Sequence, residues 1–142
     1  MVELIDVSGA PHINYLKLGD GAANYANYSL NSVTVGNNKL LRTLDIRNCP
    51  NLTAVPDVSG CTNIEEINIP ENTTSIGSYA FYGCSDLSSI TIDDNVKSVG
   101  YRAFDDTEYY NNEANWVNDV LYIGNHLIEA KSTLSGDYEI KP

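Results

Sequence analysis

The sequence predicts a strand-rich α/β repeat protein, in which successive coils of the chain stack and contribute strands to one parallel sheet. Apolar residues recur with a 23-residue period, so that Ile67 and Phe81 return as Ile90 and Phe104. Within each period a short run alternates apolar and polar residues, which is typical of a strand with one buried face. The 142 residues, 42% of them hydrophobic, fit one domain with a continuous core.

The strand segments carry a more specific pattern. The arrangement L-x-x-L-x-L-x-x-N/C, with Ile replacing some of the Leu residues, occurs at 41–49, 64–72 and 87–95. Self-similarity at 20–29 residues built on this pattern is the signature of leucine-rich repeats. We therefore predict a leucine-rich-repeat solenoid with a parallel sheet on one face. The segment 78–83 is expected to form one short helical turn that ends at Gly83.

The repeat phase organises the whole chain as a single leucine-rich-repeat domain, 1–142. We expect about four full coils, partial coils at both ends, a five-residue insertion in the first coil at "GDGAANYANY" and a longer insertion after the fourth coil. The ranges are coils 13–40, 41–63, 64–86 and 87–109, insertion 108–133, and the start of a next coil at 134–142. Neither end resembles a polar cap. We therefore expect an excerpt from a longer protein, whose uncapped coils would permit end-to-end self-association.

The coil 64–86 shows how each repeat should bury its apolar residues. Ile67 and Ile69 point inward from the strand, and Phe81 closes the core from the opposite side. Asn72 ends the strand, where a buried amide could bond main-chain groups of adjacent coils. Phe81 and Phe104 occupy the same position in neighbouring coils, so we predict that their rings are buried and stacked.

The insertion 108–133 contains too many apolar residues to remain in water. Its alternation around Gly124–Asn125, a turn pair, predicts a hairpin with Leu121, Ile123 and Ile128 on the buried side. A lone hairpin is marginal in water, so we expect it to pack on the coil 87–109. Trp116 should anchor this contact.

Three cysteines occur, and Cys61 and Cys84 hold the same repeat position. That position suits a small buried group, so we expect Cys49, Cys61 and Cys84 to be free buried thiols. A Cys61–Cys84 disulfide is sterically conceivable, because neighbouring strands lie about 4.8 Å apart. No C-x-x-C motif is present, which argues against a metal site.

Charge and hydropathy exclude several partners. The net charge is −11 with only eight basic residues, which argues against nucleic acid, whose phosphates need Lys and Arg. No apolar run approaches the roughly 18 residues of a membrane helix, so no membrane insertion is expected. The charge favours solubility, although it leaves a cationic ligand open.

The segment "IPENTTSIGSYAFYGCSDLSSITIDDNVKSVGYRAF" at 69–104 resembles the BspA-type (Treponema pallidum-type) leucine-rich repeats of bacterial surface proteins. Their pattern is L-x-x-I-x-I-P-x-x-V-x-x-I-G-x-x-A-F-x-x-C, and the match is strong over 64–107. The segment 111–131 followed by "YEIKP" is similar to an insertion between such repeats in gut Firmicutes proteins. Residues 4–63 lack the A-F pair and resemble repeats in tail-associated proteins of gut bacteriophages.

This resemblance implies a non-catalytic protein- or glycan-binding scaffold of a secreted or surface-displayed bacterial protein, with a role in adhesion and no cofactor. The expected location is extracellular or at the cell surface. Two alternatives stay open. One is a bacteriophage tail or receptor-binding segment, located in the virion tail. The other is a repeat region attached to an enzyme whose catalytic domain lies outside these residues.

The residues themselves favour a non-enzymatic role. His12 and His126 are the two histidines, and nothing places a Ser or Cys nucleophile and a carboxylate beside either. Calcium prefers six to eight oxygen ligands, which the pairs Asp93–Asp94 and Asp105–Asp106 could supply in part. Solvated turns are the favoured interpretation of both pairs, so we predict no metal site.

Two sets of candidate binding residues remain. The first set consists of outward positions of the sheet, a polar and weakly acidic face: Tyr15, Lys17, Thr43, Asp45, Glu66, Asn68, Ser89 and Thr91. The second set consists of aromatic residues in the insertions, because insertions often carry recognition loops: Tyr25, Tyr28, Tyr109, Tyr110, Trp116 and Tyr122. The same rings could instead shield the flank of the solenoid.

Overall fold

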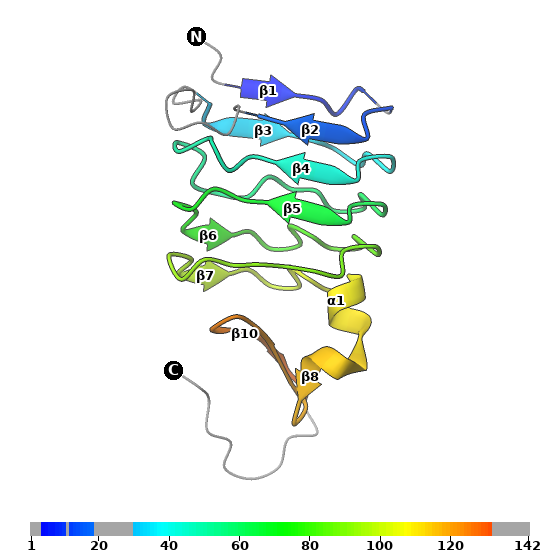
Figure 1. The fold of residues 1–142 in the computed structure, drawn as a ribbon, viewed down its shortest axis with the longest axis vertical. Helices are drawn as coiled ribbons and strands as arrows, with labels where there is room; N and C mark the ends of the chain where they lie inside the picture. Colours follow the sequence, from blue (N-terminus) through cyan, green and yellow to red (C-terminus); the bar gives the residue numbers. More distant parts are fainter. Residues whose placement is uncertain (1–3, 11, 19–29, 132–142) are drawn as a thin grey trace.

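The computed structural model describes residues 4–10, 12–18 and 30–131. Over these ranges the chain forms a strand-rich repeat fold whose coils stack along the longest axis of the molecule (Figure 1). The expected start of another coil at 134–142 lies outside the described residues, as do Tyr25 and Tyr28.

One side of the stack is a parallel sheet, which we call the front sheet. It consists of β2 (Tyr15–Lys17), β4 (Thr43–Asp45) and β5 (Glu66–Asn68), in that order. The middle residues Leu16, Leu44 and Ile67 are register partners across the sheet and face the core. This register agrees with the repeat phase. The corresponding segment 89–91 of the next coil, expected as a fourth strand, forms no strand.

Short parallel strands also pair along the return path of each coil. β1 (Leu4–Asp6) pairs with β3 (Ser32–Thr34), and β6 (Ser75–Ile76) pairs with β7 (Ser98–Val99). Ala54 bridges to Ser75 between them. The arrows of β3, β6 and β7 run opposite to those of the front sheet in Figure 1, so each coil crosses the molecule and returns.

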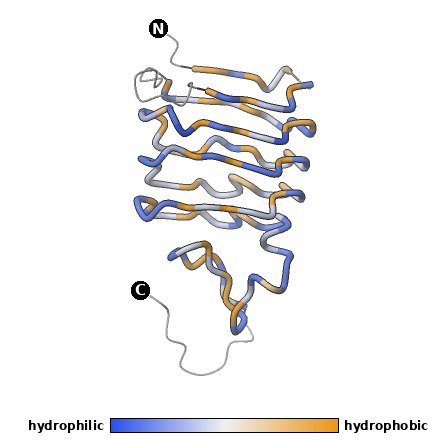
Figure 2. The backbone as a smooth tube through the Cα atoms, viewed as in Figure 1, coloured by the Kyte–Doolittle hydropathy of each residue, from blue (hydrophilic) through white to orange (hydrophobic). Residues whose placement is uncertain are grey.

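The core repeats from coil to coil. Phe81 and Phe104 are each only 1% exposed, and their rings stack with centroids 5.0 Å apart and planes 15° from parallel. The prediction of a buried phenylalanine stack is confirmed. Ile67, Ile69, Ile90 and Ile92 belong to the same apolar cluster. Figure 2 shows hydrophobic and hydrophilic residues mixed along each coil of the stack, as alternating burial requires.

The expected helical turn at 78–83 is a series of tight turns and not a helix. Hydrogen bonds of the i to i+3 kind link Gly77 to Ala80 and Tyr79 to Tyr82. Tyr79 has φ 60°, outside the helical region, which interrupts any helix. Gly83 follows with φ 72°, so the expected left-handed residue does end the turn.

Buried donors tie each coil to the preceding one. The thiols of Cys61 and Cys84 donate to the carbonyl oxygens of Gly36 and Val58 at 3.2 and 3.3 Å. Asn38, in the same repeat position, donates to the Ala10 carbonyl at 3.0 Å. All three cysteines are free and fully buried, with no Cys61–Cys84 disulfide. Burial raises the pKa of the Cys84 thiol to about 12.

The residues after the fourth coil form a C-terminal unit. It contains α1 (Glu108–Asn111), the 3-10 helix η2 (Glu113–Asn115) and three antiparallel strands in the order β10-β9-β8. The strands are β8 (Trp116–Val117), β9 (Val120–Ile123) and β10 (His126–Ala130). α1 is the one α-helix in the described part of the chain, and the Thr107 hydroxyl caps it.

The unit has one strand more than the predicted hairpin. Gly124–Asn125 joins β9 to β10 as expected, with Gly124 at φ 58°. A second turn, Asn118–Asp119, joins β8 to β9, and both of its residues have positive φ, as a type I′ turn requires. Leu121 and Ile123 are buried as predicted, Ile128 is half-buried, and Val120 is buried as well.

The unit packs on the fourth coil, as its apolar content required. Ile123 joins the repeat core, and the Tyr109 N–H donates to the Leu87 carbonyl of that coil at 2.9 Å. Within the unit, the Tyr109 hydroxyl donates to the Tyr122 carbonyl at 2.8 Å. The ring Nε2 of His126 lies 3.2 Å from the Asp93 carbonyl oxygen. This position places the unit at the end of the stack, below β7 in Figure 1.

A candidate binding face on the front sheet

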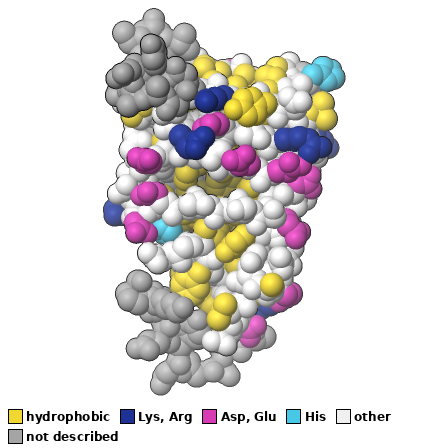
Figure 3. Space-filling view, in the orientation of Figure 1, with side chains coloured by type: hydrophobic (Ala, Val, Ile, Leu, Met, Phe, Trp, Pro, Cys, Tyr) yellow, Lys and Arg dark blue, Asp and Glu magenta, His cyan; other side chains and the backbone are white. Residues whose placement is uncertain are grey.

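Six of the eight predicted sheet-face residues come together on the front sheet. The register places Tyr15, Thr43 and Glu66 in one row across the three strands. Lys17, Asp45 and Asn68 form a second row beside it. The structure places the other two, Ser89 and Thr91, in the unpaired segment of the fourth coil, where both are exposed. Acidic and basic side chains gather on the face that Figure 3 shows.

The two ends of the first row differ in character. Tyr15 is 55% exposed and supplies an aromatic ring at the edge of the face. The Glu66 carboxylate accepts a hydrogen bond of 2.8 Å from the side-chain amide of Asn68. Arg42 and Glu65 pair beside this row. Aromatic and charged groups that reach solvent side by side are chemistry suited to a polar ligand surface.

Asp45 departs from the prediction, because its side chain is only 6% exposed. The guanidinium of Arg47 folds back onto it with two parallel bonds, Nε to Oδ1 at 3.0 Å and Nη2 to Oδ2 at 2.8 Å. These hydrogen bonds hold the pKa of Asp45 below its ordinary value. Arg47 remains 57% exposed and is the group that the face displays here.

Sequence reasoning missed Arg47, although a signal was present. Residues i and i+2 of an extended segment point to the same side, so Asp45 and Arg47 should meet. The prediction stopped at the strand end and did not consider the residue that follows it. The consequence is a masked carboxylate and an exposed guanidinium at the edge of the sheet.

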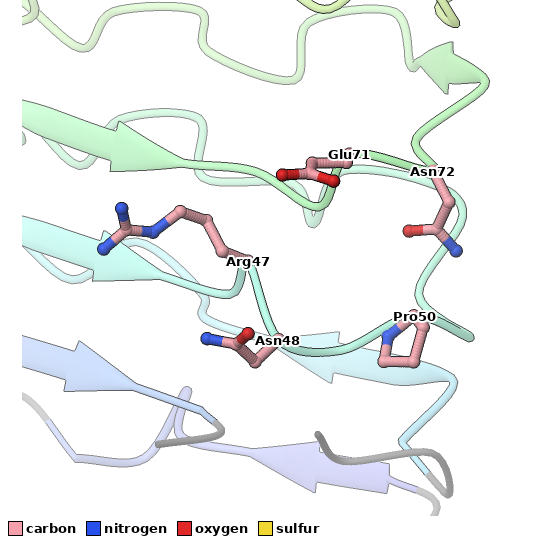
Figure 4. A pocket seen from close by; sticks show the side chains of 5 residues that line it. All are labelled: Arg47, Asn48, Pro50, Glu71 and Asn72. Atoms are coloured by element: carbon pink, nitrogen blue, oxygen red, sulfur yellow. The ribbon is translucent and has the colours of Figure 1, made fainter. Parts of the chain in front are cut away.

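A cleft of about 450 Å³ opens beside Arg47, between the turns that follow β4 and β5. Its lining residues are Arg47, Asn48, Pro50, Glu71 and Asn72. Figure 4 shows these side chains on two neighbouring coils, facing the space between them. One cation, one carboxylate and two amides supply both donors and acceptors, which is the chemistry of polar recognition.

The structure also corrects the expectation for Asn72. This residue is half-buried and lines the cleft, so it is not the buried tether that we expected. Its repeat counterparts do bond the preceding coil: the exposed Asn95 amide donates to the Glu71 carbonyl at 2.9 Å, and the buried Cys49 thiol donates to the Leu18 carbonyl at 3.4 Å.

The described aromatic residues of the second candidate set, Tyr109, Tyr110, Trp116 and Tyr122, all lie in the C-terminal unit. Trp116 packs edge-on against Tyr110 at 5.2 Å, and its Nε1 donates to the Tyr110 carbonyl at 2.7 Å. Lys131 lies 4.7 Å from the centre of the Trp116 ring. Burial raises the pKa of both Tyr109 and Tyr110. These contacts are structural and lie within the unit, so the expected anchoring of the unit on the fourth coil by Trp116 stays a prediction.

A second aromatic group, not predicted as a site, lies away from the front sheet. Tyr79 contacts Tyr82 and Tyr101 edge-on at 5.7 and 5.8 Å, and all three rings are exposed. The Arg102 guanidinium lies 5.3 Å from the Tyr101 ring centre. In the sequence these rings stand close to the Ala-Phe pair of two consecutive coils, with Tyr79 and Tyr82 on either side of Ala80–Phe81 and Tyr101 shortly before Ala103–Phe104.

The acidic pairs are engaged in turns. Asp94 accepts from the Asn125 amide at 3.1 Å, and Asp105 pairs with Arg102 at 3.3 Å. A hydrogen bond from Tyr82 reaches Asp106 and raises the pKa of that tyrosine. Within residues 4–10, 12–18 and 30–131 no three His, Cys, Asp or Glu side chains come close enough to hold a metal ion.

The fold and the face define a repeat module of the kind that mediates protein interactions. The family model for the BspA type leucine rich repeat region (6 copies) matches residues 58–136, more than half of the chain, and the chain belongs to this family. No curated protein and no solved structure matches. None of the helices in the described part of the chain is long and apolar enough to span a membrane.

Proposed function

We propose that the chain is a non-catalytic binding scaffold of a secreted or surface-displayed bacterial protein that acts in adhesion. In this proposal the coils form part of a leucine-rich-repeat solenoid, and the front sheet contacts a protein ligand. The observation that carries the proposal is the pair of polar rows in register on β2, β4 and β5, with a polar cleft beside them.

The lining of the cleft supports recognition over catalysis. Arg47 is already paired with Asp45, and the amides of Asn48 and Asn72 are neither nucleophiles nor bases. This cleft has no Ser, Cys or His in its lining. Interface contacts favour Tyr and Arg, and Tyr15, Arg42 and Arg47 are exposed on or beside this face.

Matched substitutions test the face. Immobilised protein would be screened by biolayer interferometry against a panel of purified extracellular host proteins, with a glycan array in parallel. For any ligand found, Tyr15→Ala and Lys17→Glu should weaken binding. Tyr101→Ala and Lys39→Glu, which change similar exposed groups off the front sheet, should not.

The outcome of the screen decides between ligand classes. A protein ligand whose affinity falls only with the front-sheet variants supports the proposal. A ligand found only on the glycan array would replace the protein ligand with a carbohydrate. If the front-sheet variants and the control variants change the affinity equally, the ligand contact does not lie on the front sheet. Protease treatment of intact producing cells tests the location of the chain. A protease added outside the cells should remove the chain if it is displayed on their surface.

A further inference from the structure

The front sheet is closed between the first three coils by a repeated set of backbone hydrogen bonds. Arg42 and Thr43 N–H donate to the Asn14 carbonyl, and Leu18 N–H donates to the Asp45 carbonyl at 2.9 Å. One coil later Glu65 and Glu66 donate to Arg42, and Ile46 donates to Asn68 at 2.9 Å. The set therefore recurs with the repeat period.

The same set is missing between the third and fourth coils. Its counterparts would be bonds from Ser88 and Ser89 to the Glu65 carbonyl, and from Ile69 to Thr91. Neither forms among the described residues. On the return path the two coils remain joined, for example by Lys97 N–H to the Thr74 carbonyl at 2.8 Å. The stack is therefore closed at the back and open at the front, and we call this opening the front seam.

The opening leaves one edge of β5 without a neighbouring strand. In a parallel ladder alternate residues bond to opposite sides, so Ile67 N–H and C=O point away from β4 toward the seam. The N–H of Ile69 points the same way. Unpaired strand edges are templates for another extended segment.

The seam also exposes part of the apolar core. Ile67 and Ile69 are half-buried, whereas Leu44 and Ile46 in the same positions of the preceding coil are fully buried. A cleft of about 190 Å³ lies here, and Thr91 and Asp93 form its far wall. Figure 3 shows hydrophobic side chains on the floor of a hollow in this face.

The C-terminal unit holds the other side of the seam. Its turn residue Asn125 bonds Asp94, and His126 lies against the Asp93 carbonyl. Gly124 lies beside Ile92, where an added Cβ would be in ordinary van der Waals contact with the Ile92 carbonyl at 3.8 Å. The front segment of the fourth coil therefore contacts the C-terminal unit on one side and has no strand pairing on the other.

The charges around the seam identify the complementary ligand. Glu71 and Asp93 line this cleft, and neither forms an ion pair among the described residues. The cation of the lining, Arg47, is neutralised by Asp45. The Asp93 carboxylate accepts a hydrogen bond from the Asn95 N–H at 2.9 Å but keeps its charge uncompensated by a cation. The seam therefore combines backbone groups that have no strand partner, an apolar floor and two carboxylates without an ion pair.

We propose that the front seam binds an extended, basic peptide segment of the partner protein, which adds a strand along the free edge of β5. Its main chain would pair with Ile67 and the N–H of Ile69. An apolar side chain would rest on the isoleucine floor, and a basic side chain would reach Glu71 and Asp93. Strand addition derives affinity from main-chain bonds and specificity from side-chain pockets. This inference rests on the proposed function and specifies its ligand class.

A short synthetic peptide that alternates lysine and valine is the probe. Titration calorimetry measures its affinity, and hydrogen exchange by NMR follows the backbone amides. We expect binding with slowed exchange at Ile67 and Ile69. A peptide of the same sequence and charge, N-methylated at alternate amides, should bind about tenfold more weakly, because it loses about two strand bonds. Equal affinity of the two peptides, or unchanged exchange at both amides, would overturn the proposal.

Protein variants test the two components separately. Glu71→Gln with Asp93→Asn should weaken binding about fivefold, since exposed ion pairs contribute modestly. Asp86→Asn with Glu129→Gln, which alters exposed carboxylates outside the seam lining, should not. Ile69→Pro removes an N–H that has no partner in the described fold, so it should weaken binding severalfold, whereas Ile69→Val should retain the affinity. If Ile69→Pro fails to fold, hydrogen exchange at the Ile67 and Ile69 amides of the unsubstituted protein still tests the proposal.

Failure here is distinguishable from failure of the proposed function. A ligand that depends on Tyr15 and Lys17, but no peptide bound at the seam, refutes strand addition alone. A peptide bound at the seam with protected Ile67 and Ile69 supports this proposal even if the polar rows bind nothing. In that case the contact belongs to the seam and not to the rows.

Discussion

Replacing Phe104 with alanine tests the register on which the whole interpretation depends. The ring is 1% exposed and stacks on Phe81 at 5.0 Å. Phe-to-Ala changes in cores cost about 3–5 kcal/mol, because burial is lost and a cavity remains. The stacked pair adds about 1 kcal/mol beyond burial. Because the C-terminal unit covers this coil, the neighbouring side chains cannot readily move in to fill the cavity. We therefore expect Phe104→Ala to lower the free energy of unfolding by about 4 kcal/mol.

The assay is urea unfolding followed by far-UV circular dichroism, with tyrosine and tryptophan fluorescence as a second probe. The expected loss equals a decrease in melting temperature of roughly 12 °C, at about 3 °C per kcal/mol for a chain of this size. Tyr101→Ala is the matched control, because this ring belongs to the same coil and is 65% exposed. Its cost should stay below about 0.5 kcal/mol.

A loss below about 1 kcal/mol for Phe104→Ala would refute the register, since no buried aromatic is removed so cheaply. Coils interact mainly with their neighbours, so unfolding could occur in steps. Coincidence of the two probes would show that one transition is being measured. Phe81→Ala should lower the free energy of unfolding by at least as much as Phe104→Ala, because the Phe81 ring lies inside the stack of coils.

Four further predictions rest on burial and charge. Cys49, Cys61 and Cys84 should react slowly with a thiol reagent in native buffer and all three should react after unfolding without reductant; a count below three would contradict free thiols. Burial raises the pKa of the Cys84 thiol from 9.0 to about 12, so its contribution to stability is complete below pH 9 and is lost as the pH rises to 12. Cys84→Ala should therefore reduce the fall in the free energy of unfolding between pH 9 and 12, as measured by denaturant melts at several pH values. Arg47→Ala should raise the lowered pKa of Asp45 in a carboxyl-carbon NMR titration, and an unchanged pKa would show that the hydrogen bonds from Arg47 are not its cause. Residues 1–110 alone should expose the end of the core and dimerise or aggregate in light scattering; a monomer with the parent melting temperature would make the C-terminal unit an appendage.

Much of the fold was predictable because burial repeats with the sequence period. The inward positions of β4 and β5, the phenylalanine stack and the buried cysteines each follow from residue type and position in the repeat. The hairpin at Gly124–Asn125 was predictable from local turn chemistry. The family assignment agrees with the residues that carried the resemblance.

The polar face was predictable only in part. Alternation placed Tyr15, Thr43 and Glu66 in one row correctly. It could not show that Asp45 is covered, because that depends on the conformation of the Arg47 side chain. The type I′ turn that adds β8 was also missed, since Asn118–Asp119 is a weaker turn signal than a pair containing glycine.

The sequence by itself determined the period, the strand phase and the identity of the core residues, since a side chain that recurs at one position meets the same neighbours in every coil. Only the tertiary structure decided where that regularity ends. The fourth coil carries the same apolar pattern as the third, yet its front segment 89–91 does not pair with β5. The C-terminal unit contacts this segment from the other side, through Asn125 and His126. Whether the segment 89–91 pairs with β5 or contacts the C-terminal unit therefore depends on contacts between distant parts of the chain. No local pattern of residues encodes such contacts.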